Sequence, residues 1–448
     1  MIGAPPQNWD GWPGAAWSIG CGAEPGETDA TSSLLYLGDC LEIMRTLPER
    51  SIDAVVTDPP YGLGFMGKAW DHAVPGIEFW AEMLRVCKPG AHVVAFGGTR
   101  LYHRQVCAIE DAGFEVRDCL MWLYGSGFPK GHDVSKAIDD AAGAEREVVG
   151  PRRLPNGRPH EYNVGFGEGD GYKSQPSACS VTAPATEEAK RWAGWNTALK
   201  PAWEPITLAR APLGGTVAAC VTAHGTGAIN VDGCRVEMSD ADADAIRNMG
   251  GFGRSEYERT PGEALNLNKN PMPCRDADPH AAGRWPANVL LDAEAGAAID
   301  RVNPNEAPAR YFYCPKAHAS DRDSGLGHKA PEPGASYELR NGSMDGRAQP
   351  MRRNLHPTVK PVDLMRYLCR LVTPPGGIVL DPFMGSGSTG KAARREGFRF
   401  VGIERAADSH ATACARVAAA LAPDPVIASE RPDSDQPGLF GDPPGVIA

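Results

Sequence analysis

The strongest constraint on the fold is an apolar run that stops at two consecutive prolines. Residues 52–56 are mostly β-branched or small and apolar, which is typical of a strand buried in a parallel sheet. Pro59 and Pro60 have no backbone N–H to donate, so the strand must end before them. The sequence therefore predicts a buried strand whose carboxyl end carries Asp58, a rigid turn and Tyr61.

The residues at this strand end could hold a planar base. Open α/β sheets bind ligands at the carboxyl ends of their strands. Asp58 and the carbonyl of Pro59 can accept hydrogen bonds from an exocyclic amino group, and the ring of Tyr61 offers a face for stacking. An ordinary turn closed by a tyrosine would have the same residues, so a second motif is needed to decide.

A second motif follows more than three hundred positions later. The apolar strand of residues 377–381 runs into a glycine-rich turn and then a helix from about residue 391, whose start has free N–H groups. The next predicted strand, residues 398–404, ends in Glu404, and an acid about twenty residues beyond a glycine turn suits the two hydroxyls of a ribose. Alone, the glycine turn would fit NAD or FAD equally well.

Together the two motifs resemble those of amino-group DNA methyltransferases of the permuted, β-type arrangement. In that family an Asp-Pro-Pro-Tyr motif precedes the target-recognition region and an Asp-Pro-Phe-x-Gly-x-Gly motif follows it, which is the order at residues 58–61 and 381–387. The resemblance covers residues 34–125 and 355–420 closely and 203–232 more loosely. It implies an α/β fold with a doubly wound, mostly parallel, Rossmann-like sheet and an inserted irregular recognition region. Related RNA and protein enzymes usually place the glycine turn first.

The resemblance also implies roles for individual residues. The implied catalytic residues are Asp58, Pro59, Pro60 and Tyr61. The implied cofactor-binding residues are Asp39, Thr358, Lys360, Asp381, Pro382, Phe383, Gly385, Ser386, Gly387, Ser388, Thr389 and Glu404. Two of these expectations have plain alternatives, because Asp39 could simply cap the following helix and residues 356–361 could be an ordinary helix start.

The implied reaction is transfer of a methyl group from S-adenosyl-L-methionine to an exocyclic amino nitrogen of a base rotated out of duplex DNA. Adenine N6 is the favoured target, because Asp at the first position of the tetrapeptide is commoner among the adenine enzymes, and cytosine N4 is the alternative. A non-catalytic DNA-binding regulatory module with the same fold is the alternative from another class. The intact Asp58, Tyr61 and glycine turn favour the enzyme. The family also implies a restriction-modification context.

The net charge of the chain is −11, the same sign as that of the DNA phosphates. Binding to DNA therefore needs local clusters of positively charged side chains. The candidate DNA contacts are Lys68, Trp122, Arg340, Arg347, Arg352 and Arg353. A solvated charged face is an equal alternative for the arginines, and a place in the core is an equal alternative for Trp122.

Composition divides the chain into seven segments. They are a flexible arm (1–32), the catalytic half of the core (33–125), an insertion or recognition loop (126–200), a core strand segment (201–233), a target-recognition region (234–355), the cofactor-binding half (356–422) and a disordered tail (423–448). In the tail, Gln436, Leu439 and Phe440 resemble the peptide by which bacterial replication proteins dock on the sliding clamp, although an incidental apolar pair would look the same.

The remaining features predict a cytoplasmic protein, bacterial or phage-encoded, that is a monomer or a homodimer. No run of about eighteen apolar residues is present, and the amino terminus lacks the basic-then-apolar pattern of a secretory signal. Twelve cysteines are scattered along the chain. Cys314 and His318 have no two further ligands nearby, so no metal site is expected.

Overall fold

The computed structural model describes residues 12–14, 17–21, 28–64, 71–125, 127, 131–151, 180–248, 280–303, 307–313, 322–327, 329–330, 332–333, 351–354, 356 and 359–421. The chain forms two compact units. The first takes its residues from Met1–Ser126, Ala202–Gly325 and Thr358–Pro423, and the second from Gly127–Pro201, Leu326–Pro357 and Asp424–Ala448.

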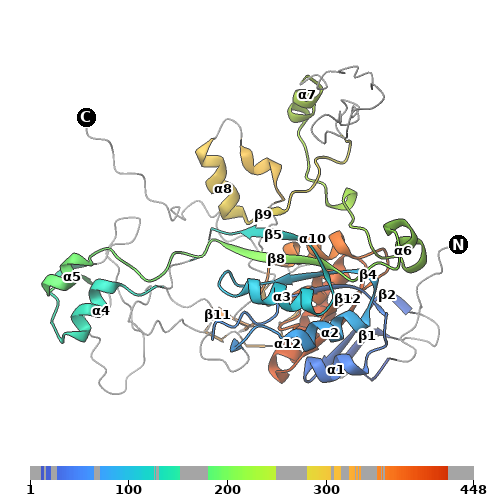
Figure 1. Cartoon of the computed structure of the whole chain (residues 1–448), viewed down its shortest axis with the longest axis horizontal. Coiled ribbons are helices and arrows are strands. Elements are labelled where there is room, and N and C mark those ends of the chain that lie inside the picture. The colour runs from blue at the N-terminus through green and yellow to red at the C-terminus, as the bar shows by residue number, and fades with distance from the viewer. Residues whose placement is uncertain are drawn as a thin grey trace, which may run out of the picture. The chain divides into compact units, whose positions relative to one another are not determined.

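A nine-stranded sheet, counted over the described residues, is the centre of the first unit (Figure 1). Its order is β1-β2-β13-β12-β3-β4-β8-β5-β9. The strands are β1 (Trp17–Cys21), β2 (Thr28–Leu37), β3 (Ile52–Thr57), β4 (Cys87–Phe96), β5 (Glu115–Leu123), β8 (Trp203–Arg210), β9 (Val289–Leu291), β12 (Ile378–Asp381) and β13 (Arg399–Glu404). Strands β2, β13, β12, β3 and β4 pair in parallel, whereas β8 is antiparallel to β4 and β5.

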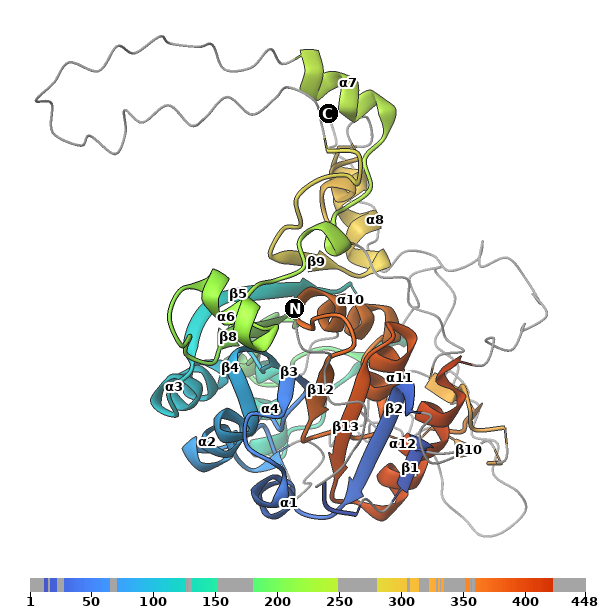
Figure 2. The same ribbon diagram turned by 90° about the vertical axis from the view of Figure 1, so that its right-hand side faces the viewer.

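Helices cover both faces of this sheet. Figure 2 shows α1 (Cys40–Thr46), α2 (Ile77–Val86) and α3 (Tyr102–Asp111) on one side, and α10 (Val362–Val372), α11 (Ser388–Arg395) and α12 (Ala407–Ala418) on the other. Successive residues of a strand face opposite sides, so Val56 packs in the cluster with α10–α12, and Val55 in the cluster with α1–α3. Burial on both faces is the reason that the middle of β3, residues 54–56, is a continuous apolar run.

The chain reverses its direction of winding between β3 and β12. These strands are neighbours, with Ala54 opposite Val379 and Val55 opposite Leu380. From β3 the sheet continues to β4 on one side, and from β12 it continues to β13 on the other. A doubly wound sheet opens a crevice at such a point, beyond the carboxyl ends of the two strands. Thr57 and Asp381 are the last residues of these strands.

Other elements of the first unit follow the sheet. They are α6 (Val217–His224), α7 (Asp240–Asn248), α8 (Ala293–Val302) and the 3₁₀ turns η4 (Asp232–Cys234), η5 (Pro308–Tyr311) and η6 (Ala419–Leu421). The second unit contains α4 (Val134–Ala141), α5 (Glu187–Arg191) and the two-stranded sheets β6 (Val148–Pro151) with β7 (Ser180–Thr182) and β10 (Glu332–Pro333) with β11 (Met351–Arg352). Among the described residues, no helix is long and apolar enough to cross a membrane.

The predicted α/β class with a doubly wound, mostly parallel sheet is confirmed. The local predictions differ in several places. Strands β1 and the start of β2 lie within the predicted flexible arm, because pairing with a sheet edge satisfies backbone groups whatever the composition. Helices α7 and α8 lie in a region with no predicted helix, and α11 begins three residues earlier than expected. Residues 88–90 are Lys-Pro-Gly, a sequence that predicts the end of a helix, but they form the first part of β4.

Candidate active site

Strand ends bring the functional side chains to one edge of the sheet. β3 and β12 end there with Thr57 and Asp381, and β4 ends there with Phe96. Because β8 runs antiparallel, it begins at this edge, and its second residue is Glu204. A parallel strand thus contributes its last residues and an antiparallel strand its first, which places Asp58 and Glu204 on the same edge.

Asp58 is the centre of a polar cluster of four side chains. Its Oδ1 accepts a hydrogen bond from Tyr61 Oη (2.8 Å), and its Oδ2 accepts one from Lys360 Nζ (2.8 Å). Tyr61 Oη also lies 3.0 Å from Glu204 Oε2. Lys360 Nζ lies 3.1 Å from Tyr61 Oη and 3.3 Å from Glu204 Oε2. Its three N–H groups therefore face three acceptors.

The charges in this cluster support one another. Burial by itself lowers the pKa of Lys360, but the negative charges of Asp58 and Glu204 outweigh it, and the net shift is upward. Burial, followed by the charges of Asp58 and Glu204, raises the pKa of Tyr61 well above its ordinary value. At neutral pH Lys360 is therefore an ammonium and Tyr61 a neutral phenol. The side chains of Asp58 and Glu204 are 17% and 20% exposed, so a ligand can reach them.

The backbone after the double proline is held by a buried carboxylate. Asp71 is 2% exposed, and its Oδ1 accepts the N–H groups of Tyr61 and Gly62 at 2.8 Å each. Its Oδ2 accepts the N–H of Leu63 at 3.2 Å. On the other side, Gly98 contacts the ring of Tyr61, where an added Cβ would lie only 3.1 Å from Cδ2. The ring is therefore fixed by its own loop and by the end of the neighbouring strand.

An aromatic wall borders the polar cluster. Trp122 lies directly opposite Glu204 in the β5–β8 pair. Its ring contacts Phe96 at 6.4 Å in an edge-to-face arrangement and Tyr124 at 5.3 Å between centroids. Burial, with the charge of Glu204, raises the pKa of Tyr124 to about 12. Trp122 is 9% exposed and belongs to the core cluster, so the structure favours the core alternative over a DNA contact.

The first acid of the glycine motif faces into the protein. Asp381 Oδ1 accepts hydrogen bonds from Thr57 Oγ1 (2.7 Å) and the N–H of Phe383 (3.1 Å), and Oδ2 accepts one from Thr389 Oγ1 (2.6 Å). Burial raises its pKa to about 6 in spite of these bonds. Asp381 therefore joins β12 to β3 and α11, and its side chain is used within the protein.

The serines and two of the glycines of this motif also have internal partners. Arg416, which is fully buried on α12, donates from Nη1 to the Ser386 carbonyl (2.6 Å) and to the hydroxyls of Ser386 (3.0 Å) and Ser388 (3.3 Å). A Cβ at Gly390 would lie 2.5 Å from the ring of Phe400. At Gly387, where φ is +79°, a Cβ would lie 3.0 Å from the next helix, α12. Close packing of the protein thus requires glycine at both positions.

Fewer residues of the glycine motif are accessible to a ligand than the sequence predicts. Phe383, Gly385 and Glu404 are partly exposed, and so is Asp39 after β2. Glu404 accepts the N–H groups of Gly385 (2.9 Å) and Ala406 (2.7 Å), and burial raises its pKa. Asp39 caps α1 by accepting the N–H groups of residues 41 and 42, as its alternative interpretation predicted. Carboxylates beside an aromatic ring are suitable partners for ribose hydroxyls and a cationic sulfonium.

Lys360 has different partners from those expected. It was predicted to bind the cofactor, but its ammonium contacts Asp58, Tyr61 and Glu204, and it lies 4.8 Å from the ring centroid of Phe96. Its binding role for a cofactor stays a prediction. The structure instead assigns it to the cluster around the double-proline motif.

Several predicted residues lie outside the described part of the chain. They are Lys68, Cys314, His318, Arg340, Arg347, Thr358, Gln436, Leu439 and Phe440. Arg352 belongs to β11 of the second unit. Arg353 of the same unit donates to the carbonyls of Gly327 (3.3 Å) and Lys329.

Three residues of the site were not predicted. Asp71 lies ten residues beyond Tyr61, and Arg416 lies on the last long helix, so neither is part of a motif. Glu204 directly precedes a proline at the start of a predicted strand, which is a weak signal for a site residue. The antiparallel direction of β8, which brings Glu204 to the crevice, cannot be deduced from local sequence.

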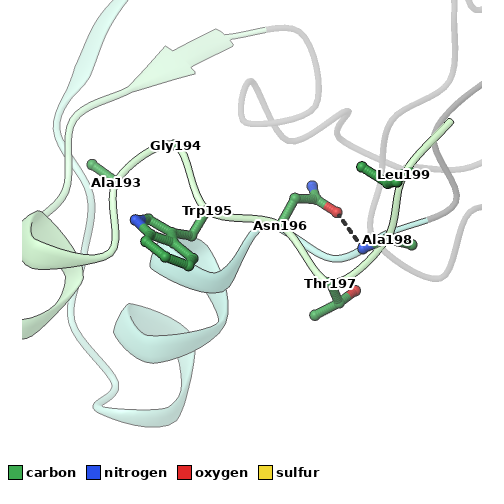
Figure 3. A pocket seen from close by; sticks show the side chains of 7 residues that line it. All are labelled: Ala193, Gly194, Trp195, Asn196, Thr197, Ala198 and Leu199. Carbon is green, nitrogen blue, oxygen red and sulfur yellow. Dashed lines mark hydrogen bonds between the residues drawn. The ribbon is translucent and has the colours of Figure 1, made fainter.

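A hollow in the second unit has a different character. Residues 193–199 line it, and Asn196 Oδ1 accepts the N–H of Ala198 (3.3 Å), as Figure 3 shows. Trp195 and Leu199 are 61% and 91% exposed. None of the lining residues is titratable. The hollow therefore offers no acid or base, and the polar cluster of the first unit is the better candidate for chemistry.

Comparison with known proteins gives partial matches. A family model described as DNA methylase (N6_N4_Mtase) matches residues 230–414. The YubD protein of Escherichia coli strain K12, named as a methylase, is 48% identical over 86 residues, which are 18% of this chain and 37% of YubD. The type II methyltransferase M2.DpnII of Streptococcus pneumoniae is 49% identical over 49 residues, which are 11% of this chain and 18% of that enzyme. The chain thus aligns with only about a third and a fifth of these relatives.

Two solved structures are also similar. One is the cytosine-N4-specific PvuII DNA methyltransferase, which is 14% identical, with 86% of each chain covered and a TM-score of 0.40. The other is the M1.HpyAVI complex with S-adenosylmethionine, which is 16% identical, with 86% of this chain and 99% of that chain covered and a TM-score of 0.34.

Proposed function

The chain is related to the amino-group (N6-adenine or N4-cytosine) DNA methyltransferases, and on that premise we propose that it methylates an exocyclic amino nitrogen in DNA. The methyl donor of this family is S-adenosyl-L-methionine. We favour adenine N6 over cytosine N4, on the resemblance of the Asp-Pro-Pro-Tyr motif alone.

One observation carries the proposal: the two motifs meet at one edge of the sheet. Thr57 Oγ1 donates to Asp381 Oδ1 at 2.7 Å although the two residues are 324 positions apart. The polar cluster around Asp58 and the partly exposed Phe383, Gly385 and Glu404 therefore lie along one edge of the sheet, on either side of its switch point. Methyl transfer needs this arrangement, because acceptor and donor must meet within a few ångströms.

The residues of the cluster can prepare an amino group for attack. The lone pair of a base amino nitrogen is delocalised into the ring, and two acceptors for its N–H groups favour a more pyramidal nitrogen with an available lone pair. Asp58 and the Pro59 carbonyl would be these acceptors. Lys360 fixes the position of Asp58 by a direct ion pair of 2.8 Å. The ring of Tyr61, held by Asp71, would stack on the base.

The donor would supply an electrophilic methyl group on a sulfonium. We assign its binding to the accessible residues of the crevice, with Glu404 and Asp39 for the adenosine part and the ring of Phe383 for the positive charge. Asp381, Ser386, Ser388 and Thr389 would act indirectly by shaping the turn, because their side chains bond within the protein.

The target base would have to leave the DNA duplex to enter the crevice. Rotation of a base out of the stack costs a few kcal/mol, and stacking on an aromatic ring offsets part of that. A DNA substrate would also place the protein with the DNA, in the cytoplasm of a bacterial or phage-infected cell. The expected contacts at Lys68, Arg340, Arg347 and Arg352, and docking on a sliding clamp, stay predictions.

The test offers labelled S-adenosylmethionine to the full-length protein with DNA, RNA and protein in separate reactions. We expect label in DNA only, and N6-methyladenine on nucleoside mass spectrometry. Asp58→Ala should reduce transfer by at least about 1000-fold, because it removes the group that polarises the nucleophile, while donor binding changes little. Asp408→Ala, an exposed acid of α12, is the matched control and should retain full activity.

Other outcomes would change the proposal. N4-methylcytosine alone would reverse the choice of base. DNA binding without transfer by the wild type would make the chain a regulatory module with the same fold. Near-wild-type turnover by Asp58→Ala would remove Asp58 from the mechanism.

A further inference from the structure

The proposed mechanism leaves one feature of the site unexplained. A single carboxylate suffices to polarise the amino group, yet the cluster contains two. Glu204 is brought to Asp58 by a separate strand, and its side chain is 20% exposed beside the aromatic wall. Burying a second negative charge there is unfavourable unless it has a partner and a use. Lys360 supplies the partner, at 3.3 Å from Oε2.

The geometry gives the second carboxylate a connection to the first. Tyr61 Oη lies 2.8 Å from Asp58 Oδ1 and 3.0 Å from Glu204 Oε2. A phenol has one proton, so it can donate to only one of these oxygens at a time. The oxygens of Asp58, Tyr61 and Glu204 therefore follow one another at hydrogen-bond distances, but in the resting state only the phenol proton lies between them. A proton added to Asp58 would allow both hydrogen bonds to form at once.

Resting on the proposed function, we propose that Tyr61 and Glu204 relay a proton away from the base during methyl transfer. When the amino nitrogen forms its bond to the methyl carbon, it becomes positively charged and must lose one of its protons. Asp58 accepts that proton on Oδ1, because its Oδ2 is bonded to the Lys360 ammonium. It then passes a proton from Oδ1 to Tyr61 Oη, while Tyr61 passes its own proton to Glu204 Oε2. The net change is one proton moved from the base to Glu204, and Tyr61 ends as a phenol again.

The surroundings suit this direction of transfer. Lys360 is bonded to all three members, and an ammonium has no lone pair, so it can steady the charges but cannot accept the proton. The high pKa of Tyr61 means that the phenol does not remain as an anion, so it transmits a proton rather than keeping one. The acidity of the amino N–H rises as the new bond to the methyl carbon forms. We therefore expect the proton to move to Asp58 in the same step as methyl transfer.

The first test is a double-mutant cycle on single-turnover rates with DNA and donor both saturating. Glu204→Gln keeps the size of the side chain and removes the acceptor, whereas Tyr61→Phe keeps the stacking ring and removes the hydroxyl. We expect each change to slow transfer by about 100-fold, which is a typical contribution of positioned proton transfer. The double variant should be no more than about threefold slower than the slower single variant, because both changes interrupt one path.

The control is Glu115→Gln. Glu115 lies at the opposite end of the same strand pair, where it pairs with Arg210 at 2.5 Å. We expect its rate to equal that of the wild type. A Glu204→Gln rate within about twofold of the wild type, or losses that multiply in the double variant, would overturn the relay. A wild type that methylates no DNA would instead refute the proposed function itself, and the relay with it.

The second test needs no activity. Incorporated 3-fluorotyrosine reports the titration of each phenol by ¹⁹F NMR, and loss of one signal in Tyr61→Phe identifies Tyr61. Because the charge of Glu204 contributes to the raised pKa of Tyr61, Glu204→Gln should lower that pKa, and Glu115→Gln should leave it unchanged. An unchanged pKa in Glu204→Gln would show that Glu204 does not face Tyr61, and would overturn the relay even in an active enzyme.

Discussion

Asp58 directly follows β3, and Asp381 is the last residue of the neighbouring strand β12. Their surroundings nevertheless give the two carboxylates different roles. Asp381 is 2% exposed, and two threonine hydroxyls and a backbone N–H surround its carboxylate. Asp58 bonds to an ammonium and a phenol and is partly exposed. The same residue type at the same edge therefore serves structure in one strand and an accessible site in the other.

The buried Asp381 should leave a signature in the pH dependence of stability. Its folded-state pKa is raised to about 6 from an ordinary value of 3.8, so folding favours the protonated form. That contribution is complete below about pH 4 and is lost as the pH rises through about 6. In Asp381→Asn the side chain cannot ionise. We therefore expect the unfolding free energy of the wild type, relative to Asp381→Asn, to fall between about pH 4 and 6.

Urea unfolding at several pH values measures this difference. Asp111→Asn, an exposed acid at the end of α3, is the control and should show no such trend relative to the wild type. A difference between wild type and Asp381→Asn that is constant over this range would contradict the prediction.

Sequence reasoning identified the residues of the site that belong to compact motifs. Asp58, Tyr61 and Glu404 stand at the ends of apolar runs, where local pattern suffices to find them. It could not identify Glu204, Asp71 or Arg416. Their places in the site depend on strand direction, loop closure and helix packing, and these are settled by contacts between distant segments.

At the scale of elements, the contact between α11 and β13 explains one glycine of the cofactor motif. Gly390 lies in α11, where alanine would normally favour the helix by about 1 kcal/mol. An added Cβ would lie 2.5 Å from the ring of Phe400 and 2.8 Å from Val417, and both of these neighbours are fully buried. Neither can move freely, so close approach of the helix to the sheet requires a residue without a side chain.

We therefore expect Gly390→Ala to destabilise the first unit. Overpacking of a buried contact costs about 1–3 kcal/mol, which exceeds the gain in helix propensity. Chemical denaturation measures the change. Gly214→Ala is the control, because a Cβ added there would have no neighbour within 4 Å and the φ of Gly214 is ordinary, so its stability should stay within about 0.5 kcal/mol of the wild type. Equal stability of the two variants would contradict the packing argument.

The regular elements were predictable where their pattern is strong. The pattern of the sequence predicts a strand at residues 203–210 and a helix at residues 362–372, and β8 and α10 have these bounds, because an apolar strand and an amphipathic helix carry their own periodicity. α8 was missed although Asp292 caps it by accepting the N–H of Ala295, a signal that a search for caps would have found. β1 has no such signal, because its backbone pairing with β2 defines it.

At the scale of the molecule, the second unit has a buried centre of its own. Asp139 on α4 accepts the N–H groups of Ala185 and Thr186 and pairs with Arg146 at 2.5 Å. Burial by itself would raise the pKa of Asp139, but these hydrogen bonds lower it to about 2. The carboxylate thus joins α4 to the start of α5, within residues 127–201.

We expect Asp139→Asn to loosen this unit selectively. The substitution removes the charge that Arg146 and the two N–H groups require, so amide hydrogen exchange in α4 and α5 should accelerate at neutral pH. Exchange in β3 and β12 should not change, because they belong to the other compact unit. Asp140→Asn, an exposed neighbour on α4, is the control. Equal acceleration in β3 and β12 would contradict this separation.

The pH dependence of the same unit has the opposite sign to that of Asp381. Because the folded-state pKa of Asp139 is depressed, its stabilising contribution is present above its ordinary value of 3.8 and is lost as the pH falls through about 2. Exchange in α4 and α5 of the wild type should therefore accelerate below about pH 4, relative to Asp139→Asn.

The amino-acid sequence by itself determined the buried strands, the double-proline stop, the glycine turn and the order of the two motifs, because each depends on residues close together in the chain. Only the tertiary structure decided which side chains of those motifs remain accessible, and that Lys360 and Glu204 join Asp58 and Tyr61. The reason is physical: periodicity records which residues are buried, whereas the partner of a buried polar group depends on which distant strand or helix folding brings beside it.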